Sequence, residues 1–290
     1  MGLKALAPAV AALALASPVQ LATPAAPPLL GLVPRQAPSP LPLPSAAKFL
    51  QAHRQPNGGF AEEGGVASPA LTAWAALGLV AAGQAPTGTL DYLRAHEGDA
   101  LPPTTRALVA LAAAALGDPQ PAGRLSTAAG QTNTIVWTIL ARRQAGQAAP
   151  KPLVNALLVR QAKSGGWGWA KGVAPDSNDT AAAVQALRVA GVTGKPIQRA
   201  LDFLRMTRNK DAGFAIVRGR ESDAQSTAWA IQAYLAAGVR VPKGAFAYLQ
   251  GLRRSDGSYR YSARYAVTPV WVTAQVVPAL VKKPFPFPRR

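Results

Sequence analysis

Short apolar segments recur at helical spacing along most of the chain, and turns rich in glycine separate them. Apolar residues in segments 46–54, 197–208 and 244–254 recur at roughly helical spacing, which is typical of amphipathic helices. Each of these segments leads into a Gly-rich turn and then into an alanine-rich segment. Alanine favours helix because ordering it costs no side-chain entropy. The pattern therefore predicts helical hairpins and an all-α fold.

The hairpins form an internal repeat, because both the turns and the helices that follow them align with one another. Four turns end on an aromatic residue, namely Phe60, Trp167, Phe214 and Tyr259. The four helices that follow share a threonine near their start, namely Thr72, Thr180, Thr227 and Thr273. Residues 104–108 and 134–137 read as two degenerate copies without the turn. We therefore expect about six hairpins over residues 46–283.

The predicted helix boundaries carry ordinary start and stop residues. Gly83, Gly191 and Gly238 follow the alanine-rich helices, as expected for helix C-termini. Ser68, Asp176 and Asp223 stand four positions ahead of the threonines, where they would act as N-caps. One hairpin cannot bury its apolar face alone, so neighbouring hairpins must stack. Periodicity alone leaves both an open solenoid and a closed double ring as solutions.

Both ends of the chain differ from the repeat. Residues 1–16 have a positive charge, an apolar stretch and a small-residue cleavage pattern, which predicts a signal peptide and a secreted or extracytoplasmic protein. That stretch is too short for a membrane span, so no transmembrane helix is expected after cleavage. Residues 17–45 read as a Pro-rich linker, and residues 284–290 as a Pro/Arg tail.

Charge and residue usage narrow the chemistry. The chain has a net charge of +18, with no cysteine and two histidines. No metal or cofactor is expected, since a Cys-ligated site is excluded and no phosphate-binding loop is present. The charge favours an anionic cell-surface polymer or lipid as partner. Nucleic acid is not expected in an exported chain without a recognition motif. The candidate basic rim consists of Arg218, Arg220, Arg260 and Arg264.

The repeat resembles the QW-type repeat of the squalene-cyclase and protein-prenyltransferase superfamily. Gln161 and the Gly165-Gly166-Trp167 turn match the second half of that repeat, and the pairs Phe203-Leu204 and Tyr248-Leu249 match its first half. The resemblance covers roughly residues 46–283. It implies an α6/α6 barrel, an α/α toroid similar to a single terpene cyclase/mutase-like domain.

An acidic stretch, DSNDTA at residues 176–181, resembles the DxDDTA motif of squalene-hopene cyclases. The resemblance makes Asp176 and Asp179 the candidate catalytic residues, since clustered carboxyls can hold a proton for an alkene. The third residue of that motif is the family's proton donor, and Asn178 stands there. An amide cannot supply an acidic proton. The alternative interpretation is helix capping, because Ser68 and Asp223 share the column of Asp176.

Three functions remain open. The first is a non-catalytic barrel that binds an apolar, isoprenoid-like molecule or an anionic surface polymer. The second is a terpene-cyclase-like enzyme that uses Asp176 and Asp179, and the third is a structural or adhesion module. Four tryptophans on alanine-rich helices are candidate lining for an apolar cavity, namely Trp74, Trp137, Trp229 and Trp271. Core packing is the alternative role for them.

Overall fold

The computed structural model describes residues 43–98 and 100–287. The signal peptide predicted at residues 1–16, and residues 17–42 of the predicted linker, lie outside the described residues. Within them, twelve helices form and five isolated β-bridges link residues of the turns. The even-numbered helices are α2 (Pro69–Ala81), α4 (Pro103–Ala115), α6 (Thr132–Gln144), α8 (Ser177–Val189), α10 (Ala224–Ala237) and α12 (Pro269–Leu280). The odd-numbered helices are α1 (Leu43–Ala52), α3 (Thr89–Ala95), α5 (Gln120–Gly123), α7 (Lys151–Val159), α9 (Lys195–Met206) and α11 (Ala245–Gly251).

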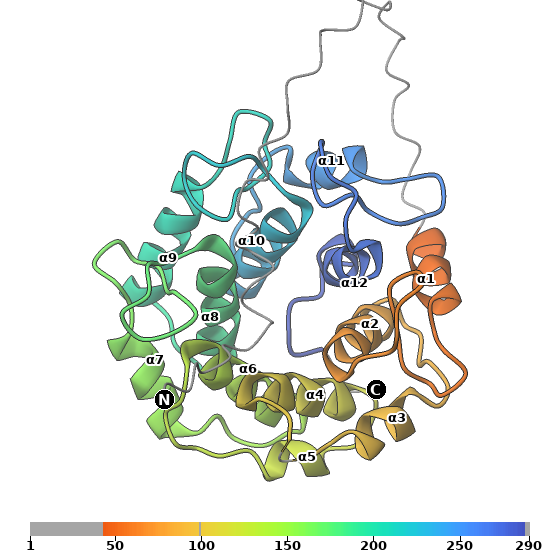
Figure 1. Ribbon diagram of the computed structural model, residues 1–290. Coiled ribbons are helices and arrows are strands. Elements are labelled where there is room, and N and C mark those ends of the chain that lie inside the picture. Colours follow the sequence, from red (N-terminus) through yellow and green to blue (C-terminus); the bar gives the residue numbers. More distant parts are fainter. Residues whose placement is uncertain (1–42, 99, 288–290) are drawn as a thin grey trace, which may run out of the picture. The chain divides into compact units, whose positions relative to one another are not determined.

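The helices form a closed double ring (Figure 1). Each even-numbered helix packs against the next even-numbered one, and α12 packs against α2, so the inner ring closes. The odd-numbered helices form the outer ring, and each contacts the inner helices beside it. The predicted α6/α6 barrel is therefore confirmed, and the open solenoid is excluded.

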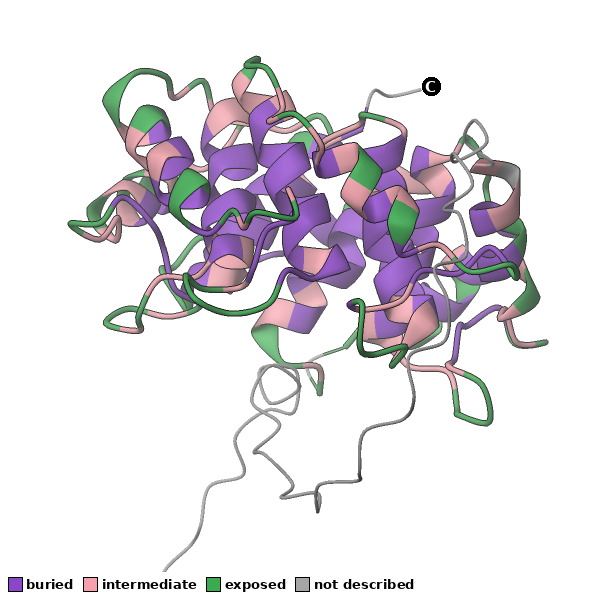
Figure 2. Cartoon of the chain, turned by 90° about the horizontal axis from the view of Figure 1, so that it is seen from above, coloured by how far each residue is buried: buried purple, intermediate pink, exposed green. Residues whose placement is uncertain are grey.

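Burial explains why the inner helices are rich in alanine. They are packed between the outer ring and the barrel axis, so nearly their whole surface is buried, whereas the outer helices and the turns carry the exposed residues (Figure 2). Small side chains let the inner helices approach closely. At the closure between α2 and α12, a Cβ added to Gly78 would lie 2.8 Å from the carbonyl oxygen of Ala274.

The repeated threonine fastens each Gly-rich turn to the inner helix that follows it. Its buried Oγ1 accepts a hydrogen bond from the backbone N–H of the turn aromatic. The four bonds are Phe60 to Thr72 at 2.8 Å, Trp167 to Thr180 at 2.9 Å, Phe214 to Thr227 at 2.9 Å and Tyr259 to Thr273 at 3.0 Å. The repeat in the sequence is therefore the signature of one hydrogen bond made four times.

The glutamine of the QW-type repeat has a similar bridging role. Gln161 Nε2 donates to the carbonyl oxygens of Gly165 and Pro196, both at 2.8 Å, and so ties the turn to α9. Gly165 has a φ of +96°, and a Cβ there would collide with the carbonyl group of Arg199. Glycine is therefore required at this position, both by the backbone conformation and by the close approach.

The predicted helix caps are confirmed. The side chains of Ser68, Asp176 and Asp223 accept hydrogen bonds from backbone N–H groups in the first turns of α2, α8 and α10. Two predicted boundaries differ. Helix α1 begins at Leu43, inside the predicted linker, and the described part of the tail predicted at residues 284–290 packs against the barrel. No helix among the described residues is long and apolar enough to cross a membrane.

Neighbouring repeats are interlocked at the end of the ring where the inner helices begin. In each case an N–H at the start of one inner helix donates to a carbonyl oxygen in the next repeat's loop. The three bonds are Asn133 to Trp169 at 3.2 Å, Ser177 to Ile216 at 2.9 Å and Ala224 to Tyr261 at 2.7 Å. These acceptors stand two positions after the turn aromatic, so the interlock is part of the repeat.

Candidate functional site

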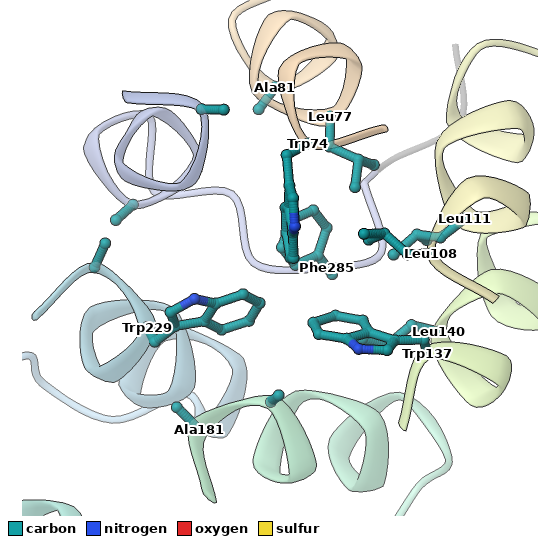
Figure 3. Packing of buried hydrophobic residues seen from close by; sticks show 14 of the residues in the cluster. Trp74, Leu77, Ala81, Leu108, Leu111, Trp137, Leu140, Ala181, Trp229 and Phe285 are labelled. Carbon is teal, nitrogen blue, oxygen red and sulfur yellow. The ribbon is translucent and has the colours of Figure 1, made fainter. Parts of the chain in front are cut away.

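Tryptophans from several inner helices meet on the barrel axis. Trp74 of α2, Trp137 of α6 and Trp229 of α10 point toward one another (Figure 3). The ring centroid of Trp74 lies 5.4 Å from that of Trp137 and 5.7 Å from that of Trp229, and the last two are 5.6 Å apart. These edge-to-face contacts are the geometry that aromatic rings prefer. Trp271 of α12 joins the cluster at 6.0 Å from Trp74 and is only partly buried.

The structure therefore brings all four predicted lining tryptophans together, and at this level aromatic side chains occupy the lumen. Trp229 is fixed by a hydrogen bond of 2.7 Å from its Nε1 to Gln275 Oε1. Leucines of α4 and α6, among them Leu108, Leu111 and Leu140, form the neighbouring wall (Figure 3). At the level of the tryptophans, the lumen is thus lined mainly by apolar and aromatic side chains.

The C-terminal segment also enters the lumen. After α12 the chain turns inward, and Phe285 reaches Trp229 at 5.9 Å and Trp74 at 6.4 Å between ring centroids. Phe287 packs against Phe285 with tilted rings, at 4.9 Å between ring centroids. Both phenylalanines are at least 95% buried. The sequence interpretation missed them because a Pro-rich composition indicates extended chain and says nothing about burial.

Buried glutamines line the inner face and were also missed. Gln144, Gln185, Gln232 and Gln275 are at most 4% exposed. Within the described part of the chain, Gln185 Nε2, Gln232 Oε1 and Gln275 Nε2 have no hydrogen-bond partner. Buried amide atoms of this kind are costly unless they are bonded. A polar residue on an otherwise Ala- and Val-rich helix was the available signal in the sequence.

The acidic pair lies at the start of α8, beside the start of α6. Asp176 caps α8 and accepts a 2.9 Å hydrogen bond from the backbone N–H of Asp179. Both carboxyl groups are partly buried, and their side chains hydrogen-bond to each other. Asn133 of α6 also hydrogen-bonds to the Asp179 side chain. The structure thus brings the two predicted catalytic residues together, and capping accounts for Asp176.

The two carboxyl groups influence each other's ionisation. Burial raises the pKa of Asp179 well above its ordinary value, and the charge of Asp176 raises this pKa further. Burial also raises the pKa of Asp176, although its hydrogen bond with Asp179 opposes the shift. A raised pKa favours the protonated form of a carboxyl group, but it also makes that group a weaker proton donor. The direction of both shifts therefore weakens the pair as an acid, whereas protonation of an alkene requires a strong acid.

The four predicted rim arginines lie on two neighbouring loops at the end of the ring where the inner helices begin. Arg264 Nε forms an ion pair of 2.8 Å with Glu221, which ties the loop of Arg260 and Arg264 to that of Arg218 and Arg220. Arg260 is occupied by carbonyl oxygens of its own loop. Among the described residues, the exposed side chains of Arg218 and Arg220 have no hydrogen-bond or ion-pair partner. The rim is therefore only in part available to an anion.

A pocket opens at the opposite end of the ring, where α2, α4 and α6 end. Its volume is about 510 Å³. Its walls are mainly small apolar residues, including Val80, Ala114 and Leu116. Phe287 and Lys283 of the C-terminal segment form its remaining side. The pocket therefore adjoins the segment that fills the lumen.

Comparison with known proteins places the closed ring in a known fold class. No family model and no curated protein matches the sequence. Among solved structures, the type II terpene cyclase MstE from Scytonema superposes with a TM-score of 0.64 at 17% identity, over 83% of this chain and 96% of the cyclase. A variant of that cyclase was solved with its substrate, geranylgeranyl dihydroxybenzoate.

Two further structures extend the comparison. Protein geranylgeranyltransferase-I from Candida albicans, complexed with GGPP, has a TM-score of 0.57 at 12% identity, over 83% of this chain and 90% of that one. The ent-copalyl diphosphate synthase from Streptomyces platensis has a TM-score of 0.52 at 21% identity over 76% of this chain, which spans about half of the synthase (52%). The fold is therefore an α/α toroid, the fold that these terpene cyclases and this prenyltransferase share, as the repeat resemblance predicted.

Proposed function

We propose that the barrel binds an elongated, apolar, isoprenoid-like molecule in its lumen. The observation that carries this proposal is the convergence of Trp74, Trp137 and Trp229 on the barrel axis, where Trp74 and Trp229 also contact Phe285 (Figure 3). The lumen already holds a narrow apolar segment against indole rings, and burial of apolar surface against such rings is favourable. Structures of the same fold with geranylgeranyl dihydroxybenzoate and with GGPP support this class of ligand.

Titration with geranylgeraniol, followed by tryptophan fluorescence and calorimetry, tests the proposal. We expect saturable binding that weakens at least fivefold in Trp137→Ala. Trp169→Ala is the matched control, because this side chain is 37% exposed and makes no ring contact with the cluster. The proposal fails if neither the full chain nor a chain ending at Lys283 binds geranylgeraniol or farnesol.

A second candidate function, proton-initiated cyclisation of a polyprene, is favoured by the Asp176–Asp179 pair. The superfamily contains cyclases, and burial raises the pKa of both carboxyl groups at the start of α8. Asn178 opposes this function, because the resemblance gives that position to the proton donor. Incubation with squalene and geranylgeranyl dihydroxybenzoate, with mass-spectrometric product analysis, tests it. Product that disappears in Asp179→Asn and increases in Asn178→Asp would support a cyclase. No product from the wild type or from Asn178→Asp would contradict it.

We also propose that the protein is exported and that its basic surface binds an anionic polymer or lipid. Export is supported by the pattern of residues 1–16 and is tested by fractionation of the native host. An anionic polymer or lipid as a surface partner is supported by the net charge of +18 and by the exposed Arg218 and Arg220. Salt-sensitive binding to anionic vesicles that is lost in Arg218→Ala/Arg220→Ala would support it. Binding that is unchanged by salt would contradict it.

A further inference from the structure

The C-terminal segment, residues 281–287, occupies the centre of the barrel although it belongs to neither helical ring. It follows α12 and crosses toward α8 and α6. Phe285 is 2% exposed and Phe287 is 5% exposed, which is the burial of core residues. Phe285 contacts Trp74 and Trp229, two of the four predicted lining tryptophans. The segment thus fills the space that an apolar ligand would take.

The segment is held by side chains rather than by secondary structure. Phe285 N donates to Gln185 Oε1 at 2.8 Å, and Phe287 N donates to Gln144 Oε1 at 2.7 Å. Gln144 Nε2 donates in return to the carbonyl oxygen of Phe287 at 3.3 Å. Within the described part of the chain, residues 284–287 have no backbone–backbone hydrogen bond. Withdrawal of the segment therefore breaks three side-chain hydrogen bonds and aromatic contacts, but leaves the helices intact.

The hinge of the segment lies at its lysines. Lys283 Nζ donates to the carbonyl oxygen of Ala81 at 2.9 Å, at the C-terminal end of α2. Lys282 lies 5.7 Å from the ring centroid of Phe246 and has a φ of +56°. These contacts fix the start of the segment at the rim of the barrel, and the part beyond Lys283 enters the lumen.

A pocket adjoins the segment. The 510 Å³ pocket between the C-terminal ends of α2, α4 and α6 is lined by Phe287 and Gln144. Phe287 therefore lies between this pocket and Phe285, which touches the tryptophan cluster. If Phe287 withdraws, the space that it vacates joins the pocket, and the withdrawal of Phe285 continues this path to Trp74 and Trp229.

From these contacts, we propose that residues 284–287 are a displaceable plug that competes with the apolar ligand for the lumen. The inference rests on the proposed function for the ligand class, whereas the peptide–lumen contact stands independently of it. The lumen holds this plug as a peptide with Phe at alternate positions, whose backbone N–H groups donate to Gln185 and Gln144. A ligand that enters the lumen must replace the contacts of the plug. The apparent affinity for the ligand is therefore lower than the affinity of the open barrel, because only the molecules with the plug withdrawn can bind.

The test compares three chains: the full chain, a chain ending at Lys283, and a control ending at Phe287 that keeps the plug. Geranylgeraniol affinity should rise at least tenfold in the chain ending at Lys283 and stay within twofold in the control. A synthetic peptide of residues 282–287 should bind the chain ending at Lys283 and compete with geranylgeraniol. Phe285→Ala/Phe287→Ala in the full chain should raise affinity in the same direction, in case the truncated chain does not fold.

Locking the plug in place tests the reverse effect. Two introduced cysteines can be cross-linked selectively, because the natural chain contains no cysteine. Gln144→Cys/Phe287→Cys joined by a short thiol cross-linker should abolish geranylgeraniol binding, and a cleavable linker should restore it on reduction. Equal affinity in the full and plug-free chains, with no binding of the peptide, would overturn the plug. Peptide binding without any isoprenoid binding would retain the plug and overturn only the proposed ligand class.

Discussion

The carboxylate of Glu62 caps the last inner helix, because its Oε1 accepts a 2.9 Å hydrogen bond from the backbone N–H of Trp271. Its Oε2 accepts a second bond of 3.0 Å from Val270 N. Glu62 stands two positions after Phe60, in the register where other repeats use a backbone carbonyl for the same task. At the ring closure a carboxylate thus replaces a carbonyl, and its charge complements the helix dipole.

Glu62→Ala should weaken the ring closure. Two N–H groups at the start of α12 lose their acceptors, so we expect a loss of about 1–2 kcal/mol in the free energy of unfolding. Urea unfolding followed by circular dichroism measures it. Glu63→Ala is the matched control, since this exposed neighbour makes no described hydrogen bond or ion pair. Equal stability of the two variants would contradict the capping role.

Thr227→Val should lower the free energy of unfolding, because it removes one of the four threonine hydrogen bonds of the repeat. Valine keeps the shape of threonine but leaves the buried N–H of Phe214 without its 2.9 Å acceptor. An unsatisfied buried donor costs about 1–3 kcal/mol. Thr227→Ser keeps the hydroxyl, and should lose less than Thr227→Val in the same urea titration. If the serine variant is the less stable, the methyl group and not the hydroxyl is the important part of Thr227.

Much of this fold could be predicted because each repeat satisfies the same local requirements. The turn aromatics, the threonines and the capping column of Ser68, Asp176 and Asp223 all mark hydrogen bonds that the structure contains. Closure of the ring came from the resemblance and not from periodicity, because nothing in the spacing indicates that α12 returns to α2.

The unpredicted features depend on contacts between distant parts of the chain. The partners of Glu62 lie more than 200 positions away in α12. The burial of Phe285 depends on a lumen that exists only after the ring closes. Composition indicated an extended tail, whereas the described part of the tail bends at Phe285 and Pro286 and is buried in the lumen. The tryptophans could be placed on the inner helices, whereas their meeting on one axis required the three-dimensional structure.

Ala212→Gly should stabilise the protein. Ala212 takes the turn position that Gly165 and Gly257 occupy in other repeats, and its φ is +69°. A Cβ in the left-handed region costs about 1–2 kcal/mol. Glycine offsets part of this gain, because it raises the entropy of the unfolded chain and so costs about 0.4–1 kcal/mol of stability. The net gain should be about 0.5–1 kcal/mol in the free energy of unfolding, measured by urea denaturation.

The reverse substitution at the equivalent position supplies the control. Gly257 has a φ of +92°, and a Cβ there would collide with the carbonyl group of Ser45 in α1. Gly257→Ala should therefore destabilise the protein by more than the conformational cost alone. If Ala212→Gly is no more stable than the wild type, the turn tolerates a side chain at this position without strain.

Asp223 should make the stability of the protein depend on pH. Burial raises the pKa of this carboxyl from its ordinary value of 3.8 to about 7, against the opposing hydrogen bonds from Ser226. Between about pH 4 and pH 7 the native state therefore holds a proton that the unfolded state has lost. The free energy of unfolding must fall as the pH rises through this window, by up to about 1.4 kcal/mol per pH unit while the native carboxyl stays protonated.

Asp223→Asn isolates this contribution, because an amide oxygen can still accept the N–H of Ser226 but has no proton to lose. Urea unfolding at half-unit steps from pH 4.5 to pH 8 should show a shallower slope for the variant than for the wild type. The residual slope should come from Asp176 and Asp179, since burial raises their pKa values in the same direction. Ser226→Ala should have the opposite effect, because it removes a hydrogen bond that favours the ionised carboxylate and so extends the falling region to higher pH. If the free energy of unfolding depends on pH in the same way for the wild type and Asp223→Asn, the prediction is wrong. The Asp223 carboxyl would then ionise in the native barrel as readily as in the unfolded chain.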